Sequence, residues 1–332
     1  VWMGSDGSNK IIQAATRPPG GSFGEPEDLS SPGQNAANPQ IAIGPDGTAT
    51  VVWYLEGSVV QAATRPPGDS FGNPVDISES GQFAAEPRVA VAPDGTTTIV
   101  WYRSNGINRI VQAATRPPAG VFGDPVDLSE DGKDAGGPEI AVGADGTATV
   151  IWTRDRTVQS ATRPPGGAFG VPVDLSSQWT AVGYQEVVIA PDGTTTAMWA
   201  RVSNGASPVV GVQTATRPPG GTFGDPVDLT PSDQFADRPR IAVAPDGTAT
   251  VVYQFYGDGG ISIQASTRPP GGSFADPVNV SGSDLDSTPG FAQIAMASDG
   301  TARVVWDRYL HGGGVLIQAA MRPPGSSFGS PV

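Results

Sequence analysis

The hydrophobic pattern of the chain is a succession of short apolar runs, separated by turns rich in glycine, proline, aspartate and serine. Residues 96–102 are typical, because three threonines lead directly into Ile, Val, Trp and Tyr. Branched and aromatic residues in such runs favour β-strands. No segment shows the 3.6-residue apolar period of an amphipathic helix over helical length. The pattern therefore predicts an all-β chain with almost no helix.

Four such runs make one unit, and the unit recurs along the chain. In the second complete copy we expect strands A to D at residues 88–92, 96–102, 110–115 and 125–129. Gly95 allows the positive φ that a tight A–B turn requires. Two prolines follow strand C and end it, because proline cannot donate to a strand ladder. Each unit is thus expected to be a small antiparallel sheet.

Three sequence markers define the repeat. The first is Gln-x-x-Thr/Met-Arg-Pro-Pro, with its arginine at Arg17, Arg65, Arg116, Arg163, Arg217, Arg268 and Arg322. The second is an Asp-Gly turn, with its aspartate at Asp46, Asp94, Asp145, Asp192, Asp246 and Asp299. The third is an aromatic residue in strand B, at Trp2, Trp53, Trp101, Trp152, Trp199, Tyr253 and Trp306. A period of about 50 residues with four strands per repeat is typical of propellers.

The two-sided apolar character of strand B indicates how the units pack. A sheet of one unit cannot bury both faces alone, so neighbouring sheets must stack. This favours a β-propeller of four-stranded antiparallel blades, in which the repeated Trp is a packing residue. We expect one domain over residues 1–332, with a partial B-C-D blade at 1–30 and full units from near 39, 87, 138, 185, 239 and 290.

The strand count favours seven blades. It gives 27 predicted strands, one strand A short of seven complete blades, and a six-bladed ring is the alternative. The repeated Asp is expected to cap backbone N–H groups in its turn. The repeated Arg is expected to form a structural bridge to a strand D aspartate such as Asp127, or else to clamp an anion.

Composition narrows the chemistry. The chain has no cysteine and one histidine, which excludes the usual zinc sites and thiol chemistry. The formal net charge of −14 disfavours nucleic acid, and no apolar run is long enough to insert into a membrane. No cofactor is expected, and the weak calcium candidates are the acidic loop 283–286 and the segment 257–259. We expect a monomer or part of a larger chain.

Residues 190–199 read Ala-Pro-Asp-Gly-Thr-Thr-Thr-Ala-Met-Trp. This phrase resembles the A–B hairpin of secreted bacterial propellers that are loosely called sialidase-like. The resemblance implies the propeller fold and an extracellular or cell-surface location. The Asp-box of true sialidases has one residue between Asp and Gly, whereas the two are adjacent here in all six copies. The arginine triad and the Tyr-Glu nucleophile are also missing, so no catalytic residue is assigned and the chain is not expected to be an enzyme.

Strand parity separates two kinds of loops. The A–B and C–D turns share one end of each sheet and repeat closely, while the B–C and D–A loops share the other end and vary. Binding residues usually lie on variable loops of a rigid scaffold. The candidates on this variable face are Tyr102, Arg103, Arg154, Arg156, Trp179, Tyr184, Arg201, Tyr256, Arg308 and Tyr309.

Three functions fit these observations. The first is a non-catalytic binding module for carbohydrate or for a surface protein. The second is a structural spacer in a larger secreted protein. The third is a glycoside hydrolase, which would need paired carboxylates outside the repeat positions.

Overall fold

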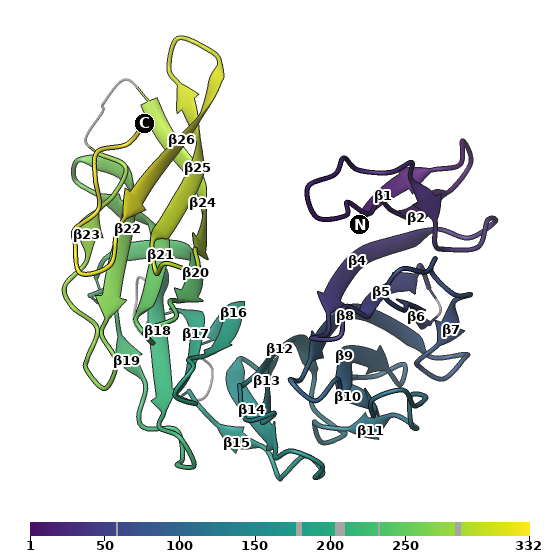
Figure 1. Cartoon of the computed structure of the whole chain (residues 1–332). Coiled ribbons are helices and arrows are strands. Elements are labelled where there is room, and N and C mark those ends of the chain that lie inside the picture. Colours follow the sequence, from purple (N-terminus) through teal and green to yellow (C-terminus); the bar gives the residue numbers. More distant parts are fainter. Residues whose placement is uncertain (58, 177–180, 203–209, 232, 283–286) are drawn as a thin grey trace. The chain divides into compact units, whose positions relative to one another are not determined.

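The computed structural model describes residues 1–57, 59–176, 181–202, 210–231, 233–282 and 287–332. Every regular element in these residues is a β-strand, which confirms the all-β prediction. The strands form seven antiparallel sheets, five of four strands and two of three. They divide into unit 1, Val1–Asp155 with Ser160–Val173, and unit 2, Arg156–Gln159 with Asp174–Val332 (Figure 1). The described residues include no helix able to cross a membrane.

The sheets follow the chain in order. The first holds β1 (Trp2–Ser5), β2 (Lys10–Ala14) and β3 (Glu27–Asp28). The second holds β4 (Ala36–Ile43), β5 (Ala49–Leu55), β6 (Val60–Arg65) and β7 (Val75–Asp76). The third holds β8 (Phe83–Val91), β9 (Thr97–Ser104), β10 (Arg109–Arg116) and β11 (Val126–Asp127). The fourth holds β12 (Ala135–Val142), β13 (Ala148–Arg154), β14 (Thr157–Arg163) and β15 (Val173–Asp174).

The remaining three sheets have the same plan. The fifth holds β16 (Ala181–Ile189), β17 (Thr195–Val202), β18 (Val210–Arg217) and β19 (Val227–Asp228). The sixth holds β20 (Phe235–Val243), β21 (Ala249–Gly257), β22 (Gly260–Arg268) and β23 (Val278–Asn279). The seventh holds β24 (Ser287–Met296), β25 (Ala302–Leu310) and β26 (Val315–Arg322). Its fourth position is taken by Val332, which exchanges two backbone hydrogen bonds with Ala319.

Strand A begins three to five residues earlier than the sequence pattern predicts. In the third sheet β8 starts at Phe83 rather than Arg88. The register shifts between Ala85 and Arg88, where a β-bulge places Glu86 at φ 54°. Pro87 directly follows the bulge and is accommodated there, because bulges interrupt the ladder.

The repeated turns lie together at one end of each sheet. Gly95 adopts φ 89°, and a Cβ at this position would lie 3.6 Å from Cβ of Pro118 in the C–D turn. The A–B and C–D turns of the third sheet are therefore neighbours, as strand parity predicts. The B–C and D–A loops lie at the opposite end.

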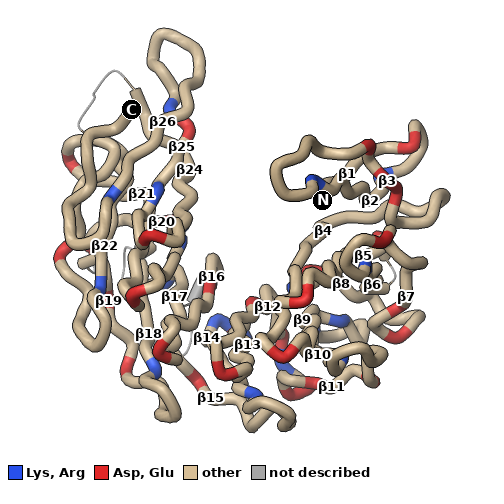
Figure 2. Tube along the Cα trace, viewed as in Figure 1, with Lys and Arg blue, Asp and Glu red and all other residues tan. Residues whose placement is uncertain are grey.

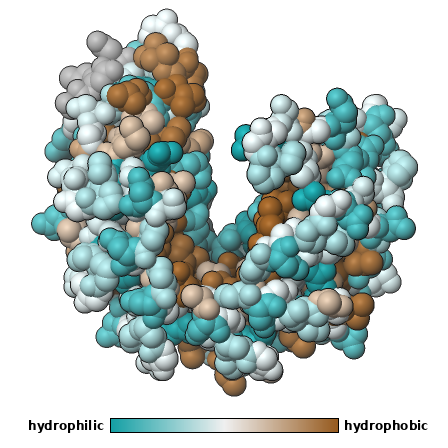
Figure 3. Space-filling view, viewed as in Figure 1, coloured by the Kyte–Doolittle hydropathy of each residue, from teal (hydrophilic) through white to brown (hydrophobic). Residues whose placement is uncertain are grey.

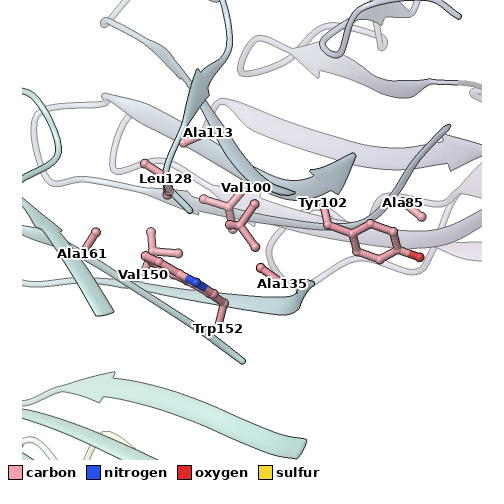
Figure 4. Close-up of a cluster of buried hydrophobic side chains, with 10 residues drawn as sticks. Ala85, Val100, Tyr102, Ala113, Leu128, Ala135, Val150, Trp152 and Ala161 are labelled. Carbon is pink, nitrogen blue, oxygen red and sulfur yellow. The ribbon is translucent and has the colours of Figure 1, made fainter. Parts of the chain in front are cut away.

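Neighbouring sheets pack by one repeated rule inside each unit. In unit 1, Val100 and Ala113 of the third sheet pack against Val150 and Trp152 of the fourth (Figure 4). The same arrangement joins the first sheet to the second, the second to the third, the fifth to the sixth and the sixth to the seventh. At each of these junctions, the face of a sheet that carries its repeated Trp or Tyr packs against the preceding sheet. The contact is with the face of that preceding sheet that does not carry its own aromatic residue.

The repeated aromatic residue is buried in six of its seven copies. Trp53, Trp101, Trp152, Trp199 and Tyr253 are fully buried and Trp306 is 1% exposed, which confirms the packing role. Trp2 is 38% exposed, because its face of the first sheet points away from the second sheet.

The seventh sheet has an exposed apolar face of its own, opposite the face that carries Trp306. Val305, Ile317 and Met321 are 40%, 70% and 48% exposed. Figure 3 shows apolar surface around the β25 and β26 end of unit 2.

Candidate functional site

Strands B, C and D of a sheet are linked by a relay of polar side chains. Trp53 Nε1 donates to Gln61 Oε1 at 3.2 Å, and Gln61 Nε2 donates to Asp76 Oδ1 at 2.8 Å. The first sheet repeats the relay through Trp2, Gln13 and Asp28. In these two sheets the glutamine of the repeat marker satisfies both the indole N–H and the strand D carboxylate, whereas the indole N–H groups of Trp101 and Trp306 have no partner among the described residues. The prediction that the repeated Arg pairs with this aspartate is wrong.

The repeated arginine instead reaches the threonines of the preceding sheet. Arg116 Nη1 donates to Thr64 Oγ1 at 2.8 Å, and its Nη2 donates to Thr50 and Thr97 at 3.1 and 3.0 Å. Its guanidinium also lies 5.3 Å from the ring centroid of Phe122. Burial lowers the pKa of Arg116, and Asp46 opposes this effect. The arginine is thus a bridge between sheets, with hydroxyl groups in place of the expected carboxylate.

The same bridge occurs at other junctions. Arg163 donates to Thr98, Arg268 to Thr216 and Thr196, and Arg322 to Thr250. Threonine suits this place because its branched side chain fits a strand while its hydroxyl accepts the hydrogen bond.

The repeated aspartate caps its own turn, as predicted. Asp94 Oδ1 accepts the backbone N–H of Thr96 at 2.8 Å, and its Oδ2 accepts the hydroxyl of the same residue at 3.0 Å. These bonds lower the pKa of the Asp94 carboxyl. All six turn aspartates accept the N–H of the residue two positions later.

A cavity of about 500 Å³ lies between the turns of the second and third sheets. Its polar lining includes Asp46, Thr64 and Arg116. Asp46 already accepts hydrogen bonds from Thr48 in its own turn, and Arg116 already donates to Thr64. We therefore assign this cavity to the structural contacts between sheets.

Four of the predicted site arginines occupy one position, two residues after the repeated Trp. Arg103 pairs with Asp127 at 3.0 Å, Arg154 with Glu130 at 2.6 Å, and Arg201 with Asp228 at 2.5 Å. Arg308 donates to Gln318 Oε1 at 2.8 Å. Their side chains are largely covered, so these arginines mainly stabilise strand ends at the variable face.

The other predicted residues are distributed over this face. Arg156 is exposed in the β13–β14 turn at φ 65°, and Trp179 lies outside the described residues. Tyr102 is 9% exposed and lies beneath Arg109, whose guanidinium is 5.3 Å from the ring centroid. Tyr184, Tyr256 and Tyr309 expose 42%, 37% and 47% of their surface in unit 2.

The strand A bulge holds side chains at a strained position. Asn38, Glu86, Tyr184 and Arg238 have φ of 52°, 54°, 53° and 52°. Such a conformation costs about 1 to 3 kcal/mol in a residue other than glycine. The bulge position is thus occupied in spite of this cost, and by chemically different side chains in the different sheets. Bulges of this kind re-aim a side chain and are frequent beside functional sites.

In unit 2 the bulges of three sheets gather one group of residues, here called the aromatic cluster: Tyr184, Phe235, Tyr256, Phe291, Asp237 and Arg238. Phe235 and Tyr256 meet edge to face with ring centroids 4.6 Å apart. The guanidinium carbon of Arg238 lies 3.5 Å from the ring centroid of Phe291. Burial raises the pKa of Tyr256, and Asp237 and Tyr184 add to this effect.

Hydrogen bonds fix the cluster to the seventh sheet. Tyr256 donates its hydroxyl to Gln254 Oε1 at 2.9 Å, and Gln254 Nε2 donates to the carbonyl of Pro289 at 2.9 Å. The backbone N–H of Phe291 donates to Asp307 Oδ1 at 2.8 Å. Asp307 also raises the pKa of Tyr309 through a side-chain hydrogen bond, so Tyr309 lies at the edge of the cluster.

The variable loops pointed to Tyr184, Tyr256 and Tyr309, but not to Phe235, Asp237, Arg238 and Phe291. A sequence signal exists for Phe235 and Arg238. The phrase Gln-Phe-Ala-x-x-Pro-Arg occurs at 82–88 and again at 234–240, whereas the corresponding stretches of the other units have different sequences. Exposed phenylalanine in a repeat is unusual, since phenylalanine is commonly buried.

Metal sites are not assembled in the described part of the chain. No group of three or more His, Asp or Glu side chains comes together there. The acidic loop 283–286 lies outside the described residues, and Asp258 lies in the β21–β22 turn. Basic and acidic residues are interspersed along both units, with acidic residues in excess (Figure 2).

Comparisons with known proteins place the fold. No family model and no curated protein matches the chain. Among solved structures it is similar to the BP39L lectin from Burkholderia pseudomallei, with a TM-score of 0.64, 15% identity, and coverage of 97% of this chain and 91% of that one. It is also similar to a polysaccharide lyase of family PL25, an ulvan lyase, with a TM-score of 0.54, 11% identity, and coverage of 86% and 80%.

A third similar structure is an α-L-arabinanase from Penicillium chrysogenum, with a TM-score of 0.52, 12% identity, and coverage of 87% and 93%. At these identities the likeness shows the fold alone. The fold is all-β and propeller-like, with seven blade-like sheets among the described residues.

Proposed function

We propose that this chain is a non-catalytic carbohydrate-binding propeller with seven blades, acting outside the cell or at the cell surface. The solved structures that support this idea are named as a lectin, a polysaccharide lyase and an arabinanase. All three names concern carbohydrates, and the first is a binding protein that the chain matches over 97% of its length. The preference for seven blades over six rests on the repeat count.

The observation that carries the proposal is the aromatic cluster of unit 2. Exposed aromatic rings offer flat surfaces on which the C–H faces of a pyranose can stack. Asp237 and Arg238 lie among these rings and supply an acceptor and a donor for sugar hydroxyls. A site of this composition, with apolar surfaces and a few placed polar groups, is typical of small-molecule recognition.

The absence of a catalytic role is part of the same proposal. Glycoside hydrolysis needs two carboxyl groups about 5 to 9.5 Å apart on either side of the bond. The turn aspartates are held by backbone N–H groups, and strand D aspartates such as Asp76 accept from glutamine. These repeated carboxylates act as structural hydrogen-bond acceptors.

A glycan array tests the proposal. The intact chain is expected to bind a defined subset of glycans, and Tyr256→Ala is expected to weaken that binding at least tenfold. Phe23→Ala is the matched control, because Phe23 is also an exposed aromatic residue but follows the Pro-Pro turn at the opposite end of its sheet. An array without signal at high protein concentration contradicts carbohydrate binding and favours the spacer function.

A further inference from the structure

Unit 1 contains a second copy of the phrase that builds the aromatic cluster. Gln82-Phe83-Ala84-Ala85-Glu86-Pro87-Arg88 corresponds to 234–240 in unit 2. In both copies the phenylalanine begins strand A and is exposed, 42% for Phe83 and 37% for Phe235. In both, the residue before proline has a positive φ, 54° at Glu86 and 52° at Arg238.

The strands that present Phe83 and Phe235 are each anchored by an ion pair. The last arginine of each phrase contacts a glutamate on strand A of an adjacent sheet. Arg88 Nε contacts Glu139 Oε1 of the following sheet at 2.8 Å, and Arg240 Nη1 contacts Glu186 Oε1 of the preceding sheet at 3.2 Å. Both strands are therefore fixed to a neighbouring sheet, although on opposite sides.

A cavity of about 430 Å³ lies beside Phe83. It is lined by Gly81, Gln82 and Phe83 of the D–A loop and by residues 103–106 of β9 and the B–C loop. This volume lies within the roughly 300 to 1,000 Å³ of small-molecule sites. Oε1 of Gln82 is buried and has no hydrogen-bond partner among the described residues, while Nε2 donates to Glu79 at 3.0 Å. A ligand hydroxyl reaches this oxygen when the partly exposed Gln82 side chain turns toward the cavity.

The charges around the cavity are balanced. Arg103, in its wall, is paired with Asp127 at 3.0 Å. Arg109, above Tyr102, is paired with both carboxylate oxygens of Asp134. The bulge residue is Glu86 here, whereas it is Arg238 in unit 2. This environment favours an uncharged ligand and disfavours a carboxylate or sulfate group.

We propose that unit 1 carries a second glycan site, centred on Phe83 and the cavity lined by Gln82 and Arg103, which takes a neutral pyranose. The inference rests on the proposed function and extends it, because it gives the chain two non-identical sites in separate units. Two weak sites raise the avidity for a multivalent glycan surface without any additional contact.

Fluorine NMR with 4-fluorophenylalanine in the full chain tests this site separately from the aromatic cluster. The chain has 11 phenylalanines, so individual Phe→Leu variants assign the signals of Phe83, Phe235 and Phe23. The probes are the methyl glycosides of glucose, galactose and mannose, with glucuronic acid as the charged comparison. We expect a neutral glycoside to shift the Phe83 signal in a saturable manner, glucuronic acid to leave it unmoved, and the Phe23 signal to stay fixed.

The variant Gln82→Ala should weaken the Phe83 response at least threefold while leaving the Phe235 response unchanged. Shifts at Phe235 alone overturn the second site and leave the proposed function intact. Shifts at Phe83 alone support the second site and contradict the assignment of the aromatic cluster. No shift at either residue with any of the glycosides overturns both.

Discussion

Removal of the Arg116 side chain should destabilise the protein by about 3 kcal/mol. Thr50 and Thr97 are 0% and 1% exposed, and each loses the guanidinium as a hydrogen-bond donor. A buried polar group that loses its partner costs about 1 to 3 kcal/mol. Loss of the cation–π contact with Phe122 adds about 0.5 to 1 kcal/mol, and water admitted to the half-buried site offsets part of the total. Hence the Arg116→Ala variant should be clearly less stable to unfolding than wild type.

The assay is thermal unfolding followed by circular dichroism and tryptophan fluorescence. At about 2.1 cal/mol/K of unfolding entropy per residue, Tm of the 332-residue chain should fall by roughly 4 °C. Arg17→Ala is the matched control, since Arg17 has the same repeat position and the same contact with a phenylalanine, Phe23, but is exposed. If Arg116→Ala lowers Tm no more than Arg17→Ala does, the bridging role of the repeated arginine is refuted.

Three further predictions concern the repeat. Trp152→Ala should lower the free energy of unfolding by about 3 to 5 kcal/mol because the side chain is fully buried, whereas Trp2→Ala should lower it much less. Urea unfolding measures both variants, and equal losses of stability would contradict the packing rule. Gln61→Ala should lower the free energy of unfolding by about 1 to 2 kcal/mol in the same assay, because it leaves the buried Trp53 N–H without its acceptor. An unchanged urea midpoint of unfolding would show that stability does not depend on the relay. The folded pKa of Asp94 is lowered by its turn hydrogen bonds, so its stabilisation is complete above the unfolded pKa of about 3.9 and is lost as pH falls through the folded value. Asp94→Asn should therefore lower Tm at neutral pH and converge with wild type in acid, and a constant gap at all pH values would argue against the charge.

The sequence was most informative where the physics is local and repeated. Branched runs, Asp-Gly turns and Pro-Pro ends determined the strand order, the turn caps and the burial of the repeated tryptophan. The partner of the repeated arginine could not be found this way, because both Asp76 and Thr64 lie near the right strand ends in sequence. Only the three-dimensional structure shows that Gln61 donates a hydrogen bond to Asp76, whereas Arg116 donates to Thr64.

The candidate site was predicted only in part for a related reason. Variable loops pointed to Tyr184 and Tyr256, which the structure places in the aromatic cluster, but a bulge cannot be read from a pattern that assumes regular alternation. Arg238 therefore appeared to be an ordinary residue before proline. Its positive φ turns the side chain onto Phe291, a contact between sheets that sequence spacing does not encode.

The aromatic cluster is proposed to bind carbohydrate without cleaving it. The most direct measurement takes the glycan that gives the strongest array signal, titrates it into wild-type protein and Tyr256→Ala, and then analyses the recovered glycan by mass spectrometry. Binding to wild type should be saturable, binding to the variant should be at least tenfold weaker, and the mass of the glycan should be unchanged after prolonged incubation. Equal affinity for both proteins, or a glycan recovered as shorter fragments, would refute non-catalytic binding through the aromatic cluster.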